Sequence, residues 1–273
     1  MIRRITTTLN YMALSAVTLV MLTPLAWLVC ATFKRREDFF AYDFLPPLDR
    51  LSLDNFRNLF EQIPYMGFLV NSLFVSTATV VVQLMLSSLG GFALAKYRFR
   101  GKRVVVLLML GLLVVPSEVM LAPLYEMLYH LGLLDSFRGL IAPHAVSVFG
   151  MFLFAQSMRQ VPDELLSAGR VDGCGELGLY WRIVMPVSRP MIGAFCLIAF
   201  MNSWNSFLWP LIVLQSQDNF TLPLGLSQMV GVYREDYGAL MAGTLLSVLP
   251  VAVLFFALQK EFVAGLMSGA LKG

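Results

Sequence analysis

The sequence predicts an all-α membrane protein with six transmembrane helices. Of its 273 residues, 58% are hydrophobic and only 14% are charged, which leaves too little polar surface for a soluble domain of this size. The apolar residues also gather in long runs that hold almost no charge. A helix that crosses the hydrocarbon core needs about 20 such residues. Because backbone groups in lipid must hydrogen-bond within their own segment, we expect each run to be a helix.

Six apolar runs define the expected spans. Four of them are long enough to cross unaided: residues 12–33, 68–95, 191–214 and 240–258. The third run in chain order, 104–115, reaches that length if its helix continues through Pro116 and Pro123 to about Leu128. The fourth, 140–154, is completed by the next four residues. The first run is too long for the apolar region of a signal peptide, so we expect it to be a retained helix.

The runs divide the chain into five parts. They are an N-terminal segment (1–10), a first span (11–33), a long connecting segment (34–67), a core with the other five spans (68–260) that contains a long loop (159–190), and a C-terminal tail (261–273). The connecting segment carries Pro46-Pro47 and a helical pattern over 53–61. We expect it to pack as a cap over the bundle.

The distribution of Lys and Arg predicts the orientation. With six spans both ends of the chain share one side, and that side holds 13 of the 20 basic residues. The short loop 96–103 alone contributes five of them. Since cytoplasmic loops carry the Lys/Arg excess, we expect a multi-pass membrane protein with both termini and the 159–190 loop in the cytoplasm.

The sequence gives no sign of enzyme chemistry. It contains no Gly-rich phosphate loop ending in Lys-Ser or Lys-Thr, and no catalytic or metal-binding cluster of His, Cys and Asp. Cys30, Cys174 and Cys196 lack metal-ligand spacing. The basic residues are spread among loops, which argues against nucleic acid as a partner. We expect no catalytic residue, no metal and no cofactor.

Polar groups within the spans are candidates for a substrate path. Glu118 is an ionisable group in a span, which is costly and is a functional hypothesis by default. It either meets substrate or pairs with a neighbour. Asn202, Trp204 and Asn205 combine an aromatic face with amide donors and acceptors, a chemistry that suits sugars. The alternative for the amides is hydrogen bonding between helices. Gly90-Gly91 indicates close helix packing.

The loop 159–190 has the pattern of a helix, a tight turn and a second amphipathic helix. Residues 162–164, Pro-Asp-Glu, start a helix, because Pro suits the first turn and acids complement the helix dipole. Asp-Gly at 172–173 ends it in a tight turn. A second amphipathic segment, 177–185, ends at Pro186. Such an element at the membrane face suits the docking of a partner.

Several pieces of this loop keep a fixed spacing. Ser-Ala-Gly at 167–169 is followed after three residues by Gly173, and after nine more by Ile-Val-Met-Pro at 183–186. The flanks are Pro-Asp-Glu-Leu at 162–165 and Val-Asp-Gly at 171–173. This pattern resembles the signature loop of ATP-binding-cassette (ABC) importer permeases, in its carbohydrate branch, where the triplet is Glu-Ala-Ala and the end is Ile-any-Leu-Pro.

The resemblance assigns the loop to the coupling helix, which sits in a cleft of the ATPase subunit. The residues so assigned are Glu164, Ser167, Ala168, Gly169, Asp172, Gly173, Ile183 and Pro186. Within the triplet, two positions depart from the pattern: Ser167 replaces the family's Glu, and Gly169 replaces its second Ala. The missing carboxylate puts one polar contact to the ATPase in doubt, and Glu164, one turn earlier, is a substitute. A mid-helix Gly costs about 1 kcal/mol of helix propensity.

Further stretches resemble the carbohydrate branch, in order and at its usual spacings. They are residues 71–72, 93–102, 123–133, 204–211, 221–223 and 259–273. In the related systems the C-terminal ending enters the ATPase interface, so the resemblance implies a role there for Lys272 and Gly273.

The resemblance implies the type I ABC importer permease fold, a location in the bacterial cytoplasmic (inner) membrane and a set of partners. These are a homologous permease subunit in a heterodimer, two ATP-binding subunits, an extracytoplasmic solute-binding protein and membrane lipid. The chain would form half of the translocation pathway for a sugar or oligosaccharide. No Arg or Lys lies mid-span, which favours a neutral sugar. The alternatives are a permease for glycerol 3-phosphate or another small solute, a stand-alone secondary transporter, and a membrane scaffold.

Overall fold

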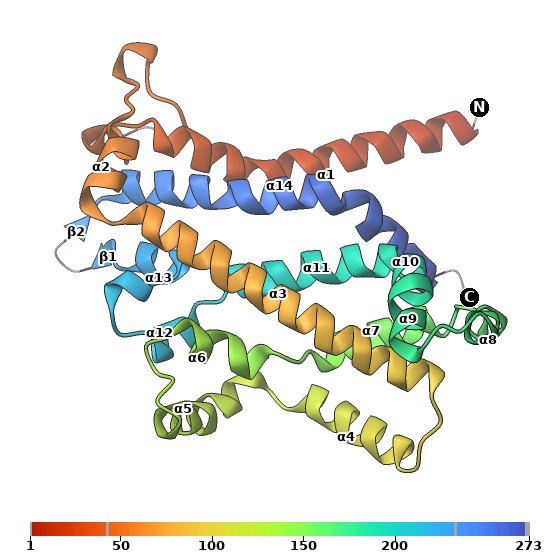
Figure 1. Ribbon diagram of the computed structural model, residues 1–273. Helices are drawn as coiled ribbons and strands as arrows, with labels where there is room; N and C mark the ends of the chain where they lie inside the picture. Colours follow the sequence, from red (N-terminus) through yellow and green to blue (C-terminus); the bar gives the residue numbers. More distant parts are fainter. Residues whose placement is uncertain (1, 42–43, 232–233, 271–273) are drawn as a thin grey trace. The chain divides into compact units, whose positions relative to one another are not determined.

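The computed structural model describes residues 2–41, 44–231 and 234–270. The chain forms two compact units, the first from residues 1–67 with 225–249 and the second from residues 68–224 with 250–273. Figure 1 follows their elements along the chain.

The first unit contains one long helix, a short helix and a small hairpin. Its elements are α1 (Ile2–Thr32), the 3₁₀ turns η1 (Arg36–Asp38) and η2 (Leu48–Arg50), α2 (Asp54–Gln62), the antiparallel strands β1 (Val230–Gly231) and β2 (Arg234–Glu235), and the first part of α14 (Tyr237–Ala270). The described side chains of α1 are exposed along most of its length. This suits a helix that contacts lipid.

Helix α2 packs on the start of α14. The Asn55 amide donates hydrogen bonds to the carbonyls of Thr32 at 2.9 Å and Lys34 at 2.7 Å. Gly238 leaves room for it, since a Cβ there would lie 2.2 Å from the Asn55 side-chain oxygen. Gln62 donates to the Asp236 carboxylate at 2.9 Å. The helix expected at 53–61 is therefore present, and it fastens the connecting segment to α14.

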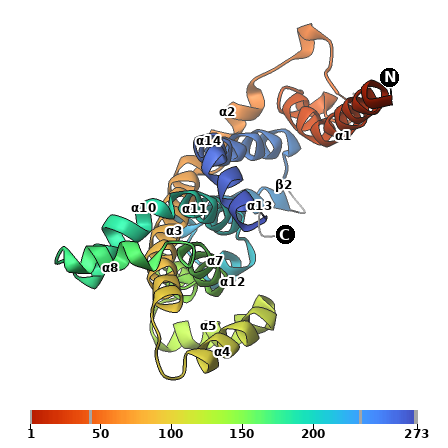
Figure 2. The same ribbon diagram turned by 90° about the vertical axis from the view of Figure 1, so that its right-hand side faces the viewer.

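The second unit is a helical bundle. Its elements are most of α3 (Tyr65–Lys96), α4 (Lys102–Val114), η3 (Ser117–Met120), α5 (Leu121–His130), α6 (Phe137–Ile141), η4 (Ala142–His144), α7 (Val148–Met158), α8 (Asp163–Val171), α9 (Glu176–Leu179), a π-helical turn η5 (Tyr180–Val184), α10 (Met185–Val187), α11 (Arg189–Trp204), α12 (Leu208–Val213), η6 (Gln217–Asn219), part of α13 (Leu222–Ser227) and the end of α14. Helix α7 contacts both α4 and α11, and Figure 2 shows α7 beside α11.

Close packing against α7 requires a glycine on α3. A Cβ at Gly91 would lie 2.5 Å from the Phe154 Cβ and 2.9 Å from the Ala155 backbone nitrogen. The backbone of α7 cannot retreat as a flexible side chain could. The expectation that Gly90-Gly91 marks close helix packing is confirmed.

The described residues contain up to six membrane spans. Three helices are long and apolar enough alone: residues 6–32, 65–96 and 237–265. Three more spans arise if each bent helix pair counts as one: 102–114 with 117–130 at 96°, 137–144 with 148–158 at 47°, and 176–187 with 189–204 at 81°.

The continuous third helix expected through Pro116 is wrong. Helix α4 ends at Val114, Val115 is extended (φ −73°, ψ 120°), and the chain bends by 96° before the next helix. A proline disfavours helical backbone at the preceding residue and supplies no N–H, which explains the break. Pro123 lies in the first turn of α5, where proline is tolerated.

The run expected as a fifth helix, 191–214, is also broken. Helix α11 ends at Trp204 and α12 begins at Leu208. A helix continued through this point would bring the ring of Pro210 against the carbonyl of Ser206, four residues earlier. The chain instead leaves the helical conformation between Trp204 and Leu208.

Candidate functional site

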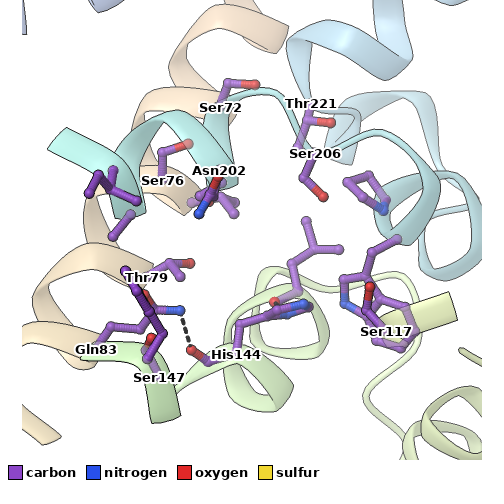
Figure 3. Close-up of a pocket in the computed structure, with 18 of the residues that line it drawn as sticks. Ser72, Ser76, Thr79, Gln83, Ser117, His144, Ser147, Asn202, Ser206 and Thr221 are labelled. Carbon is purple, nitrogen blue, oxygen red and sulfur yellow. Dashed lines mark hydrogen bonds between the residues drawn. The ribbon is translucent and has the colours of Figure 1, made fainter. Parts of the chain in front are cut away.

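The second unit encloses a cavity of about 330 Å³, which we call the polar cavity. Its polar lining consists of hydroxyls, amides and one imidazole: Ser72, Ser76, Thr79, Gln83, Ser117, His144, Ser147, Asn202, Ser203, Ser206 and Thr221. Its apolar lining is Val75, Leu140, Phe149, Phe195, Ile198, Ala199, Trp209 and Pro210. No lining residue in the described chain is Asp, Glu, Lys or Arg. Figure 3 shows polar side chains on opposite sides of the open space.

Three helix breaks meet at the polar cavity. Ser117 lies after the break that follows α4, Ser147 between α6 and α7, and Ser206 between α11 and α12, and all three line the cavity. Non-helical backbone at membrane depth is tolerated where protein buries it or where it lines a polar cavity. The breaks therefore place serine side chains around one space.

One face of α3 forms the opposite wall. Ser72, Ser76, Thr79 and Gln83 follow one another at intervals of four, three and four residues, which keeps them on one side of the helix. The remainder of α3 is strongly apolar, so this polar stripe interrupts a hydrophobic helix.

Hydrogen bonds hold the walls of the polar cavity together. The Gln83 amide donates to the His144 carbonyl at 2.6 Å, drawn in Figure 3. The Ser87 hydroxyl donates to the Ser147 carbonyl at 3.1 Å and accepts from its N–H at 3.2 Å. The Trp209 indole N–H donates to the Gly139 carbonyl at 3.2 Å. The bonds of Gln83 and Ser87 fix α3 to the break between α6 and α7, and the bond of Trp209 joins α12 to α6.

The four residues proposed for a substrate path do not all line the polar cavity. Asn202 lines the polar cavity. Trp204 is buried and stacked on Phe200 at 5.5 Å between ring centroids, and Asn205 donates to the Met201 carbonyl at 2.9 Å. Glu118 is exposed and accepts a hydrogen bond from Ser117 at 3.0 Å. Trp204, Asn205 and Glu118 are not among the lining residues.

Sequence reasoning missed the α3 stripe and Thr221. The stripe left a detectable signal, because four polar residues at helical spacing stand in an apolar run. Thr221 left none, since it lies on the loop before α13 and reaches the cavity only through the tertiary fold.

The loop 159–190 forms the helix, turn and second helix that its sequence predicts. Helix α8 begins at Asp163, directly after Pro162, and ends at Val171. Gly173 has φ +83°, its N–H bonds to the Arg170 carbonyl, and the Cys174 N–H bonds to the Gly169 carbonyl at 2.9 Å. This is a Schellman cap, which needs a left-handed residue that glycine adopts without strain.

The structure explains the glycine that replaces the second alanine of the pattern. A Cβ at Gly169 would lie 2.6 Å from Leu179 Cδ2 and 3.0 Å from Ile183 Cδ1. Leu179 and Ile183 belong to the second half of the loop, so Gly169 lets the two halves pack. Ser167, in the place of the family's glutamate, donates to the Asp163 carbonyl at 3.0 Å on the exposed side.

Charged and polar bonds fasten the loop to the end of α3. The Lys96 ammonium is 5% exposed and donates to the Val161 carbonyl and to the Asp163 carboxylate, the latter at 2.6 Å. The Lys96 ammonium holds the pKa of Asp163 below its ordinary value. Beside them, Glu176 accepts hydrogen bonds from Tyr97 and Arg170.

A buried bond makes a second connection inside the bundle. The hydroxyls of Tyr180, on the π-helical turn, and Ser88, on α3, are 2.6 Å apart, and both residues are fully buried. Single π-helical turns within helices are frequent at functional sites. Here the turn coincides with the tyrosine that reaches α3.

The exposed side of the loop carries large apolar residues among its polar ones. Leu166 is 2% exposed and points inward, whereas Val171 is 88% exposed. The exposed large apolar side chains of the loop are Leu165, Val171, Leu177, Trp181 and Val187. Apolar side chains that stay exposed in one loop can contact a partner subunit or lipid.

Two further expectations concern the C-terminal residues and metal binding. Lys272 and Gly273, assigned to the ATPase interface, lie outside the described residues. Within the described residues, no group of three His, Cys, Asp or Glu could hold a metal ion.

Apolar helices that break around an uncharged polar cavity, joined to an amphipathic helical loop, define a membrane-embedded permease. The chain belongs to the family of binding-protein-dependent transport system inner membrane components, whose model matches residues 87–266. The predicted ABC importer permease resemblance is therefore confirmed, and the protein is a multi-pass inner-membrane component.

Relatives and a solved structure agree with this assignment. The chain is 38% identical to the arabinooligosaccharides transport system permease protein AraQ of Bacillus subtilis, over 99% of this chain and 96% of AraQ. It is 32% identical to the lactose permease protein LacG of Rhizobium radiobacter, over 97% and 96%. It is 31% identical to the sn-glycerol-3-phosphate permease protein UgpE of Escherichia coli, over 88% of each. These relatives are transport permeases.

The fold matches a solved ABC importer. A chain in the crystal structure of a bacterial ABC transporter for the acidic polysaccharide alginate superimposes with a TM-score of 0.85 at 20% identity, covering 95% of this chain and 97% of the other. The predicted importer permease fold is confirmed.

Proposed function

We propose that the chain forms half of the translocation pathway of an ATP-driven importer for a neutral sugar or oligosaccharide. Both termini and the 159–190 loop lie in the cytoplasm, in keeping with the Lys/Arg excess of those segments. The partners are a homologous permease subunit, two ATP-binding subunits and an extracytoplasmic solute-binding protein. ATP hydrolysis belongs to the partner subunits.

One observation carries the coupling role: the loop exposes large apolar side chains on its outer side and is fastened to the bundle on its inner side. Val171 and Leu177 offer a docking surface for an ATP-binding subunit. Lys96 and Tyr180 join the same loop to α3, which lines the polar cavity. A movement imposed on α8 would therefore reach the cavity wall. Glu164 and Ser167, both exposed, lie at the same surface.

The substrate class is inferred from the relatives and from the polar cavity. AraQ and LacG are named for uncharged sugars. UgpE is named for an anionic substrate, which makes glycerol 3-phosphate the second candidate. The lining of the polar cavity contains no charged residue to balance a phosphate, and this favours the neutral sugar.

Substitution at the turn of the loop tests the function. Gly173→Val places a β-branched residue at φ +83°, where a side chain costs about 1–2 kcal/mol or more and the cap is lost. Uptake of sugar by cells is expected to fall at least about tenfold, while the amount of the protein in the membrane stays unchanged.

Gly175→Ala is the matched control. Gly175 has φ −69° and open space around its Cα, so an added methyl group is tolerated and uptake should stay within about twofold of wild type. Normal uptake by Gly173→Val would contradict the coupling role of the loop.

A further inference from the structure

Two buried hydroxyl groups face the polar cavity without a partner. Ser76 Oγ and Thr221 Oγ1 are buried and have no hydrogen-bond partner within the described chain. Ser76 is 1% exposed and Thr221 5%, and both residues line the cavity, Ser76 from α3 and Thr221 from the loop before α13. A buried hydroxyl without a partner is unfavourable, so such groups are normally satisfied. Their shared position indicates that their partner occupies the polar cavity.

The chemistry around these hydroxyls fits a polyol. A hydroxyl both donates and accepts, and an amide offers two donors and an acceptor, so serine, threonine and asparagine match the hydroxyls of a sugar in either sense. Asn202 extends from α11 into the same space in Figure 3, and Ser206 lies beside it at a helix break. Phe195 and Trp209 supply the apolar wall that the C–H face of a sugar ring needs.

The size and charge of the polar cavity limit which ligands it can hold. At about 330 Å³ it lies near the lower end of ligand pockets, which run from about 300 to 1,000 Å³. It therefore holds one end of an oligosaccharide rather than a long chain. Because no lining residue carries a formal charge apart from the titratable His144, a carboxylate or phosphate would lose its hydration without compensation.

We propose that the polar cavity is a binding site within this subunit for the terminal unit of an uncharged sugar, with Ser76, Thr221 and Asn202 holding its hydroxyls. The permease itself then contributes to substrate selection, in addition to the solute-binding protein. The proposal rests on the proposed function as a sugar importer and adds a site and its specificity.

Equilibrium binding to the purified complex tests the site directly. The permease heterodimer with its ATP-binding subunits, free of solute-binding protein, is titrated with arabinotriose, lactose and maltotriose. At least one of these probes is expected to bind, and the one that binds best is used for the variants. Thr221→Val and Ser76→Ala should each raise its Kd about five- to tenfold, since each leaves a sugar hydroxyl unpaired.

The same variants separate a binding role from a structural one. Thr221→Val keeps the shape of the side chain and removes a hydroxyl that has no partner in the ligand-free protein, so the thermal stability of the complex should stay equal or rise. Thr221→Ser retains the hydroxyl and should restore the wild-type Kd.

Ser188→Ala provides a matched control. Ser188 Oγ is also buried without a partner in the described chain, but it lies outside the polar cavity, so its loss should leave the Kd unchanged. Digalacturonate, an anionic disaccharide, should bind at least about tenfold more weakly than the best neutral sugar.

Each contrary result overturns a defined claim. A Kd within twofold of wild type for Thr221→Val, an equal change in Ser188→Ala, or equal affinity for digalacturonate rejects the site. Failure of the complex to bind any probe, while cells take that sugar up, rejects the site and leaves the proposed function intact. If cells import none of the three sugars in an ATP-dependent manner, the proposed function and the site fall together.

Discussion

The polar groups of the polar cavity and those of the 159–190 loop differ in their charge and in their hydrogen bonding. In the polar cavity, Ser76 and Thr221 are uncharged and unpaired within the described residues. In the loop, Asp163 and Glu176 are charged, and each accepts a hydrogen bond from the chain at the end of α3, Asp163 from Lys96 and Glu176 from Tyr97. An unpaired group retains its capacity to bind a ligand that comes and goes. A paired group holds two elements together, which suits the transmission of a movement.

Helix α3 belongs to both regions. Its stripe from Ser72 to Gln83 lines the polar cavity, and its end, through Ser88 and Lys96, bonds to the loop. If the comparison holds, substitutions at the end of α3 should impair coupling and spare sugar binding, whereas substitutions in the stripe should do the reverse.

The largest effect is expected from Lys96→Ala. It removes both the bond to the Val161 carbonyl and the ion pair with Asp163, and leaves that carbonyl without its donor. We expect uptake to fall about tenfold or more, while sugar binding to the purified complex is unchanged. Arg103→Ala, at an exposed basic residue of the same segment, is the control and should transport normally. Normal uptake by Lys96→Ala would show that the loop acts without α3.

A smaller effect is expected from Tyr180→Phe. It removes the bond to the Ser88 hydroxyl, worth about 1 kcal/mol, and leaves Ser88 bonded to the Leu84 carbonyl. We expect uptake to fall about two- to fivefold. Ser88→Ala should have a similar effect, and the double variant should be no worse than either single one, as a double-mutant cycle would show. Additive losses would mean that the two hydroxyls act separately.

The smallest effect is expected from Asp163→Asn, and it is a change in thermal stability that depends on pH. The Lys96 ammonium lowers the pKa of Asp163, so ionised Asp163 stabilises the folded loop. That contribution is present at neutral pH and is lost as the pH falls through the lowered pKa. The thermal stability of wild type should exceed that of Asp163→Asn slightly from pH 8 down to about pH 5, and the difference should vanish in strong acid. A difference that grew on acidification would contradict the pairing.

The spans and the loop could be predicted because their signals are local. Hydrophobic runs fix where helices cross, and Gly173 ends α8 by its own backbone preference. Pro116 was also a local signal for the break that precedes η3. A continuous helix was nevertheless expected, because the apolar run before Pro116 is too short to cross the membrane alone. The break after Trp204 had the same kind of signal in Pro210.

The polar cavity could not be predicted in full because it is tertiary. Its lining comes from the α3 stripe, three helix breaks and Thr221, which lie up to about 150 residues apart in the sequence. Asn202 was the one proposed path residue that reaches it. The replacement at Gly169 was unexplained by the sequence, because its reason is the contact with Leu179 and Ile183.

The energy source of transport tests the central claim most directly. The complete importer is reconstituted into proteoliposomes, and uptake of the neutral sugar is measured with ATP on the side of the ATP-binding subunits. The account predicts uptake that requires ATP, is indifferent to proton and sodium gradients, and is lost in Gly173→Val. Uptake driven by an ion gradient in the absence of ATP would contradict it and would identify a secondary transporter instead.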